Sequence, residues 1–126
     1  MRERGYKSLL TRYEGNPIFA PEEFPWCPAD QVFNPGQVMT PDGRTILLVA
    51  VIPRNEKFAR CHVAESTDGL HFTIRKKPIF EVDPDKKFGD LDFHPIDCRV
   101  TYFAEENCYY IIRPANSEWG CCALLY

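Results

Sequence analysis

The sequence predicts an all-β fold, and three observations point to it. Aromatic and β-branched residues occur in short runs, a composition typical of strands rather than helices. The 126 residues include eleven prolines and seven glycines, which indicate frequent turns. Two Asp-Gly pairs, at 42–43 and 68–69, are typical of tight connections between antiparallel strands. The chain is therefore expected to form short strands joined by hairpins.

Residues 1–35 are predicted to form an N-terminal lead-in and an extended, proline-rich segment. Five of the prolines lie within residues 16–35. Proline removes a backbone donor, fixes φ and restricts the residue before it. This stretch is therefore expected to run extended over a surface, without regular secondary structure.

Four strands are predicted within residues 36–82. They are expected at 36–40, 45–52, 60–66 and 71–75. The run at 45–52 is continuously apolar and rich in Ile, Leu and Val, which predicts a strand that is buried on both faces. Hairpins between these strands would give one compact antiparallel unit.

The same pattern begins again in residues 83–126. A charged connection without periodicity, 83–90, precedes predicted strands at 98–104, 108–113 and 120–126. This second unit repeats the first at an offset of about 60 residues, but it has no fourth strand. Tandem four-stranded antiparallel units are typical of β-propeller blades. A single β-sandwich with two similar hairpins fits the pattern about equally well.

The turn at residues 66–72 favours the propeller. Its sequence, Ser-Thr-Asp-Gly-Leu-His-Phe, resembles the Asp-box-like turn between the outer strands of many propeller blades. Asp68 is expected to cap amides of the turn, and Gly69 is expected to take a positive φ. This role is structural rather than catalytic.

Composition and charge argue against several classes of function. Fifteen basic and eighteen acidic residues give a net charge of −3, which lacks the positive field that a nucleic-acid site or a polybasic membrane anchor needs. The longest apolar stretch, 46–52, is far shorter than the roughly 18–20 residues of a membrane span. No apolar segment follows the basic N-terminus, as a secretory signal would require. Neither a glycine-rich phosphate loop nor a ligand-spaced His/Cys cluster supports a nucleotide, another cofactor or a metal.

The six cysteines are expected to be reduced thiols. Their spacing is irregular, two of them are adjacent, and the sequence contains no Cys-x-x-Cys pair. Together with the missing export signal, this predicts a cytoplasmic protein without disulfides or structural zinc.

Five elements, in order along nearly the whole chain, resemble signatures of glycoside hydrolase family 130, the mannoside phosphorylases. They are residues 10–18, 32–36, 64–72, 96–101 and 109–111. Members of this family are five-bladed β-propellers that cleave β-mannosides, mostly by inverting phosphorolysis and in some cases by hydrolysis. The resemblance implies that residues 36–82 are the first blade of such a propeller and residues 83–126 the inter-blade connection and most of the second.

The resemblance also implies that Asp97 is the general acid. In the family this Asp acts through the sugar's 3-hydroxyl, which relays its proton to the glycosidic oxygen, while inorganic phosphate attacks C1 from the opposite face. Phosphate is already an anionic nucleophile, so one protein carboxylate suffices and no cofactor is implied. From the residues alone, Asp97 and Arg99 on the same face of a strand also fit a structural ion pair that caps a blade.

Four other residues are candidates for substrate binding. Asn34 either hydrogen-bonds a sugar hydroxyl through its amide or forms a turn before a proline. Arg99 lies two residues after the expected acid. Asn116 and Trp119 lie in a loop where family members often place substrate contacts. Trp119 either stacks on a pyranose ring or packs in the core.

Two residues depart from the family pattern. Cys98 replaces the proline that usually follows the acid, and Ala50 occupies a position where the family tends to carry an Arg directed at the substrate. The phosphate-binding residues of the family lie mainly in later blades. We therefore expect the 126-residue chain by itself to be inactive in phosphorolysis.

The leading prediction is thus a glycosidase or phosphorylase whose partners are a β-mannoside and inorganic phosphate, with no nucleic acid and no membrane. Hydrolysis of β-mannosides is an alternative within the same family. A catalytically decayed carbohydrate-binding module is a second alternative. A third is a β-module that forms a homo-oligomer through its final apolar strand, 120–126.

Overall fold

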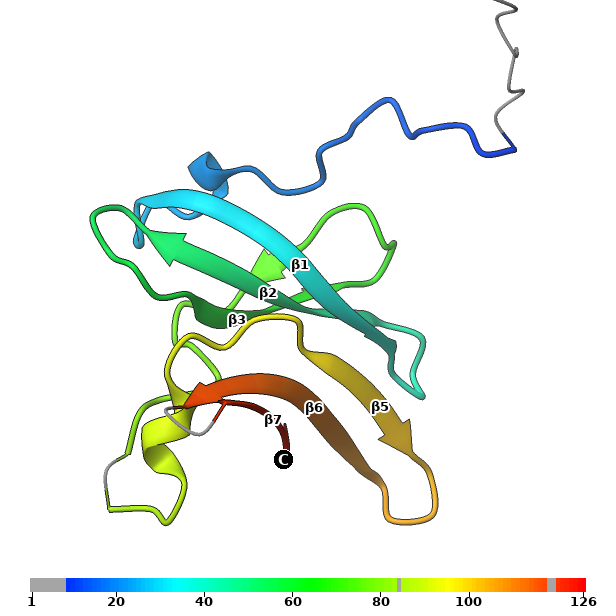
Figure 1. Cartoon of the computed structure of the whole chain (residues 1–126). Coiled ribbons are helices and arrows are strands. Elements are labelled where there is room, and N and C mark those ends of the chain that lie inside the picture. The colour runs from blue at the N-terminus through cyan, green and yellow to red at the C-terminus, as the bar shows by residue number, and fades with distance from the viewer. Residues whose placement is uncertain (1–8, 84, 118–119) are drawn as a thin grey trace, which may run out of the picture.

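The computed structural model describes residues 9–83, 85–117 and 120–126. They form two antiparallel sheets, which lie one above the other in Figure 1. The first sheet contains β1 (Ala29–Met39), β2 (Thr45–Pro53), β3 (Arg60–Ser66) and β4 (Thr73–Ile74), paired in that order. The second sheet contains β5 (Arg99–Phe103), β6 (Cys108–Ser117) and β7 (Gly120–Leu125).

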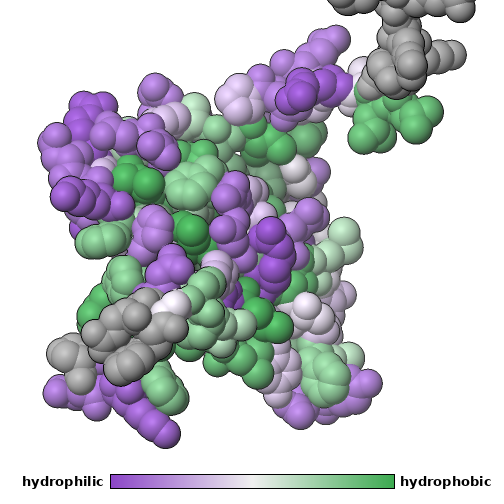
Figure 2. Space-filling view, in the orientation of Figure 1, coloured by the Kyte–Doolittle hydropathy of each residue, from purple (hydrophilic) through white to green (hydrophobic). Residues whose placement is uncertain are grey.

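Two short 3₁₀ helices lie outside the sheets. One is η1 (Pro21–Glu23), in the lead-in, and the other is η2 (Gly89–Asp92), in the connection between the sheets. In the described part of the chain, no helix is long and apolar enough to cross a membrane. Figure 2 shows apolar side chains at the surface over both sheets, among hydrophilic residues.

The all-β prediction is confirmed, and each predicted strand is present. The predicted start of the first strand is wrong, because β1 begins at Ala29, inside the stretch expected to lack regular structure. A register shift between Phe33 and Gly36 places Pro35 in a β-bulge, where its missing amide does not interrupt the ladder. Pairing with β2 therefore continues back to Ala29.

β2 is buried on both faces, as its apolar run predicts. One face of the first sheet carries a core cluster of Phe24, Ala29, Val49, Val51 and Ala64. A second cluster consists of Leu48, Cys61, Val63 and Cys98. Successive side chains of a strand point to opposite faces, so β2 contributes to both clusters. The lead-in covers the first cluster, and the second forms the interface with the second sheet.

The two sheets meet where β1 passes the residue that precedes β5. A Cβ atom added at Gly36 would lie 2.0 Å from the carbonyl oxygen of Cys98. Real Cβ atoms essentially never approach a backbone oxygen this closely. Only glycine therefore fits at this position of β1 without moving the sheets apart.

A buried arginine ties the second sheet to the connection between the sheets. The Arg113 side chain on β6 is fully buried, and its Nη2 donates to the Asp92 carboxylate at 2.7 Å and to the Leu91 carbonyl at 2.9 Å. The guanidinium lies 5.0 Å from the ring centroid of Phe80 and 5.4 Å from that of Tyr126. The ion pair and these ring contacts offset the cost of burying the charge.

The turn at residues 66–72 has the predicted geometry. Asp68 Oδ1 accepts hydrogen bonds from the amides of Leu70 and His71, at 2.9 and 2.8 Å. Gly69 has a φ of +74°. These hydrogen bonds, led by the one from the His71 amide, hold the pKa of Asp68 well below its usual range. The strand that follows the turn is shorter than predicted, spanning only Thr73–Ile74.

β3 contains a buried histidine. His62 Nδ1 lies 3.0 Å from the carbonyl oxygen of Arg75. A carbonyl only accepts, so Nδ1 carries the proton and donates it. Nε2 is buried and has no hydrogen-bond partner within the described ranges. Burial lowers the pKa of His62, so the folded protein keeps this ring neutral near pH 7.

We expect Gly36→Ala to destabilise the protein by about 3 kcal/mol, the upper part of the range for overpacking a filled site. The added methyl group would meet the Cys98 carbonyl and force the sheets apart. Urea denaturation measures this loss. Gly43→Ala is the matched control. Its added methyl group would lie in open space, so the variant should lose only the cost of a positive φ, about 1 kcal/mol. Equal losses in the two variants would contradict the close contact.

The free energy of unfolding is expected to fall as the pH drops below about 6.5, the ordinary histidine pKa. In this range the unfolded chain takes up a proton that the folded chain excludes, because the folded pKa of His62 is lowered. Urea midpoints at pH 7.5 and 5.5 measure the effect. His62→Gln should reduce the difference. An unchanged difference in His62→Gln would show that another group is responsible.

Candidate functional site

Asn34 and Asp97 are 63 residues apart in the sequence and meet at the junction of the two sheets. Nδ2 of Asn34 donates a hydrogen bond to Oδ1 of Asp97 at 2.8 Å. Asn34 lies in the bulge of β1, and Asp97 lies in the segment that leads into β5. The structure therefore brings together two residues that the sequence nominated separately.

Both residues have a left-handed backbone. The φ angle is +46° at Asn34 and +51° at Asp97. Asn and Asp tolerate this conformation better than most other residues, because their short polar side chains can hydrogen-bond locally. Strained backbone of this kind is concentrated at functional sites, where surrounding contacts hold it in place.

The segment in front of Asp97 is fixed at two points. Asp92, at the end of η2, pairs with the buried Arg113. His94, which also has a positive φ of +52°, accepts a hydrogen bond at Nδ1 from the amide of Ala59 at 2.8 Å. These two contacts attach the segment to the second and first sheets, respectively. They hold the backbone that presents the carboxylate.

Arg99, the first residue of β5, lies close to the same segment. Its Nη1 donates to the carbonyl oxygen of Cys98 at 3.0 Å. This hydrogen bond keeps the guanidinium beside the residue that follows Asp97. Asp97 itself lies before β5 and has a left-handed backbone, and no ion pair joins it to Arg99 within the described residues. The expected arrangement of the two side chains on one face of a regular strand is therefore not formed.

Asn116 lies at the same end of the second sheet as Asp97. β5 begins at Arg99, which pairs with Ile112, and β6 continues beyond that pair through Asn116. Asn116 is exposed. Trp119, the remaining candidate for substrate binding, lies outside the described residues.

Sequence reasoning missed the contact between Asn34 and Asp97. It considered a sugar contact or a turn before a proline for Asn34, whereas the structure engages the amide nitrogen with the Asp97 carboxylate. The internal repeat contained the relevant information. The two residues are about 60 residues apart and precede the strands predicted at 36–40 and 98–104, which are equivalent positions in the two units.

The pair supplies a carboxylate and an amide. The carboxylate can exchange a proton with a hydroxyl group, and the amide oxygen of Asn34 can accept a hydrogen bond. This set of donors and acceptors suits a neutral polyhydroxyl ligand. Where the structure describes the chain, no group of three or more His, Cys, Asp or Glu residues could hold a metal ion.

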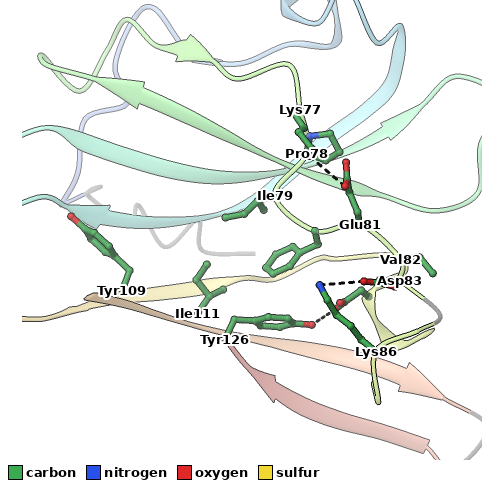
Figure 3. A pocket seen from close by; sticks show the side chains of 12 residues that line it. Lys77, Pro78, Ile79, Glu81, Val82, Asp83, Lys86, Tyr109, Ile111 and Tyr126 are labelled. Atoms are coloured by element: carbon green, nitrogen blue, oxygen red, sulfur yellow. Dashed lines mark hydrogen bonds and ion pairs between the residues drawn. The ribbon is translucent and has the colours of Figure 1, made fainter. Parts of the chain in front are cut away.

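A groove of about 690 Å³ lies elsewhere, between the connection after β4 and the second sheet (Figure 3). Charged side chains of its lining form ion pairs, and Asp92 pairs with Arg113 outside the lining. Lys86 lies 3.5 Å from Asp83, and the Tyr126 hydroxyl contacts Asp92. Burial and the contact with Asp92 raise the pKa of Tyr126 to about 12. Asn34, Asp97, Arg99 and Asn116 do not line this groove, although Asp92, which anchors the segment before Asp97, does.

Solved structures match the fold of this chain over most of its length. One match is a structure from work on glycoside hydrolase family 130. That work reports that this family of mannoside phosphorylases contains glycoside hydrolases that target β-1,2-mannosidic linkages in Candida mannan. The match has a TM-score of 0.71 and 23% sequence identity, and it covers 90% of this chain and 36% of the other. A putative glycoside hydrolase from Bacteroides ovatus matches with the same values. A putative glycosidase from Bacteroides thetaiotaomicron has a TM-score of 0.67 and 23% identity, with coverage of 91% and 38%.

These matches confirm the resemblance to glycoside hydrolase family 130 at the level of the fold. The chain spans somewhat more than a third of the length of the solved proteins that it matches. No protein-family model and no curated protein matches the sequence.

A double-mutant cycle tests the contact at this site. Asn34→Gly and Asp97→Gly keep the left-handed backbone accessible and remove only the interacting side chains. From urea denaturation of both single variants and the double variant, we expect a coupling free energy of about 1 kcal/mol. Asn55→Gly, at another left-handed residue, is the control and should not couple to Asp97→Gly. Purely additive losses for Asn34 and Asp97 would refute a direct interaction.

Proposed function

We propose that the chain belongs to glycoside hydrolase family 130 and supplies the general acid of a β-mannoside phosphorylase. The observation that carries this proposal is the contact between Asn34 and Asp97, in a fold shared with glycoside hydrolases. In this contact the Asp97 carboxylate, which is predicted to be catalytic, lies where the two sheets meet and beside Asn34, which is predicted to bind the sugar.

In the proposed reaction, Asp97 gives its proton to the sugar's 3-hydroxyl, and that hydroxyl passes its own proton to the glycosidic oxygen. Inorganic phosphate attacks C1 of the mannosyl unit from the opposite face, so that the anomeric configuration is inverted and mannose 1-phosphate is formed. The phosphate anion needs no general base. A single carboxylate from this chain is therefore consistent with phosphorolysis, whereas inverting hydrolysis would require a second one to activate water.

The other residues of the site have distinct proposed roles. Asn34 holds Asp97 through its amide nitrogen, and its amide oxygen accepts a hydrogen bond from a sugar hydroxyl. Arg99 and Asn116 bind substrate from the same end of the second sheet. Trp119 stacks on a pyranose ring, because sugars present C–H groups to aromatic faces.

We further propose that the two sheets are blades of a five-bladed propeller, whose later blades carry the phosphate site. In the first sheet, the paired residues Leu48 and Val63 are 3% and 9% exposed. Ile112 and Leu125 pair at the equivalent place in the second sheet, yet they are 51% and 63% exposed. The two pairs are equivalent because Leu48 pairs with Gly36, two residues after Asn34, and Ile112 pairs with Arg99, two residues after Asp97. A third blade would cover the exposed pair as the second sheet covers the first.

One observation favours a second function, carbohydrate binding without catalysis. Ala50 is buried on β2, where the family tends to carry an Arg directed at the substrate. The same site could then hold a mannoside without activating it. In that case Asp97→Asn should leave the affinity unchanged, and no β-mannoside should be cleaved by the protein at its natural length.

Binding is tested by NMR titration of the 126-residue chain with β-1,2-mannobiose. We expect shifts of the side-chain amide of Asn34 and of the backbone near Asp97. Cellobiose, a β-linked disaccharide with the opposite configuration at C2, is the control and should bind more weakly. The absence of binding by any β-mannoside would contradict the proposed function.

Catalysis is tested by measuring mannose 1-phosphate from β-mannosides and phosphate, with the protein at its natural length. Asp97→Asn should lower the rate at least 100-fold, in line with the loss of a general acid. Asp90→Asn, an exposed carboxylate in η2, is the control and should stay within about twofold of the original rate. The 126-residue chain alone should release no mannose 1-phosphate. Turnover by that chain would contradict a phosphate site on later blades, and release of free mannose would indicate hydrolysis.

A further inference from the structure

Cys61 and Cys98 lie side by side in the interface between the sheets. Their Sγ atoms are 3.9 Å apart, and both side chains are buried. Cys61 belongs to β3 of the first sheet, and Cys98 directly precedes β5 of the second. Figure 1 shows the segment before β5 passing beneath the first sheet. Both residues are free thiols.

We propose that Cys61 and Cys98 form a reversible dithiol–disulfide site that cross-links the two sheets, with a hydroperoxide as the oxidant. A disulfide requires about 2.05 Å between its sulfur atoms. Two thiols already in contact reach that distance through a small movement of their side chains. The apolar neighbours in the same core, which include Val100 and Ile111, offer the thiols no competing polar partner.

The surroundings assign different roles to the two thiols. The hydrogen bond with Cys61 lowers the pKa of Cys98, and the positive charge of Arg113 acts in the same direction. The same hydrogen bond, together with burial, raises the pKa of Cys61. Thiolate is the reactive form, and in the proposed reaction Cys98, on which the positive charge of Arg113 acts, attacks the oxidant. Cys61 then completes the disulfide.

The reaction balances with the peroxide as the only co-reactant. The Cys98 thiolate attacks one peroxide oxygen, the O–O bond breaks, and the other oxygen leaves as an alkoxide, or as hydroxide from hydrogen peroxide, which takes up a proton. Cys98 is then a sulfenic acid. The Cys61 sulfur attacks the sulfenic sulfur, an S–S bond forms, the S–O bond breaks, and water leaves with the Cys61 proton. Two thiols lose two electrons in total, and the peroxide gains them.

The cross-link would act directly on the candidate site. Cys98 follows Asp97, and its carbonyl oxygen faces Gly36 of β1. Its backbone therefore cannot move toward β1, and a bond to Cys61 would also prevent it from moving away from the first sheet. Oxidation should hold Asp97 at its contact with Asn34. This redox chemistry does not depend on whether the protein acts on mannosides.

The test uses two folded variants of the chain. The first carries Cys27→Ser, Cys108→Ser, Cys121→Ser and Cys122→Ser, at positions that are exposed or half-buried, and keeps only the proposed pair. The matched control adds Cys98→Ala. Each is treated with hydrogen peroxide, quenched with catalase, alkylated in denaturant and analysed by mass spectrometry, with circular dichroism as the check of folding.

In the first variant we expect the loss of two hydrogen atoms, no alkylation, and a cross-linked peptide that contains Cys61 and Cys98. Dithiothreitol should restore two alkylated thiols. The oxidised form should melt about 5 °C or more above the reduced form, because the bond constrains the unfolded chain. The control should show neither the mass loss nor the higher melting temperature.

The proposal is overturned if the folded first variant keeps both thiols alkylatable, or if its oxidation stops at sulfinic acid without a cross-link. If the serine background does not fold, peptide mapping of the oxidised wild-type chain decides the question. A Cys61–Cys98 cross-link there supports the proposal, and any other outcome rejects it.

Discussion

The contact between Gly36 and the carbonyl oxygen of Cys98 sets the spacing of the two sheets, and the other features of the junction depend on that spacing. At this separation the amide of Asn34 reaches Asp97, and the cluster that contains Cys61 closes between the sheets. A side chain at position 36 would disturb all of these contacts together, because they lie in one interface. Gly36 therefore affects the packing of both sheets.

The candidate site combines local strain with distant anchors. Left-handed backbone at Asn34 and Asp97 carries a local cost, which contacts elsewhere must offset. The ion pair of Asp92 with buried Arg113 holds one end of the segment before Asp97, and the hydrogen bond from Ala59 to His94 holds the other. Each sheet supplies one half of the site, so the site exists only when the two sheets are packed against each other.

The two departures from the family pattern lie in the same interface. Ala50 pairs with Cys61 in the ladder between β2 and β3, and Cys61 contacts Cys98. An arginine at position 50 would place a charge in the core that now contains two thiols, at a high desolvation cost. Alanine at position 50 and cysteine at position 98 are therefore compatible within a single packed cluster. If the proposed function is correct, the same cluster couples the redox state of the protein to the position of its general acid.

The existence and order of the strands, the turns and the burial of β2 on both faces could be predicted from the sequence, because these features follow from local periodicity and turn chemistry. Sequence reasoning placed the start of β1 too late, since a proline in a β-bulge has the same local pattern as one in an extended segment. It nominated Asn34 and Asp97 separately, through a resemblance to a family. The internal repeat is consistent with the neighbourhood of Asn34 and Asp97, but their hydrogen bond and the contact of Cys61 with Cys98 follow from tertiary packing. Both contacts depend on how closely the two sheets approach each other, a distance that local periodicity and turn chemistry do not encode.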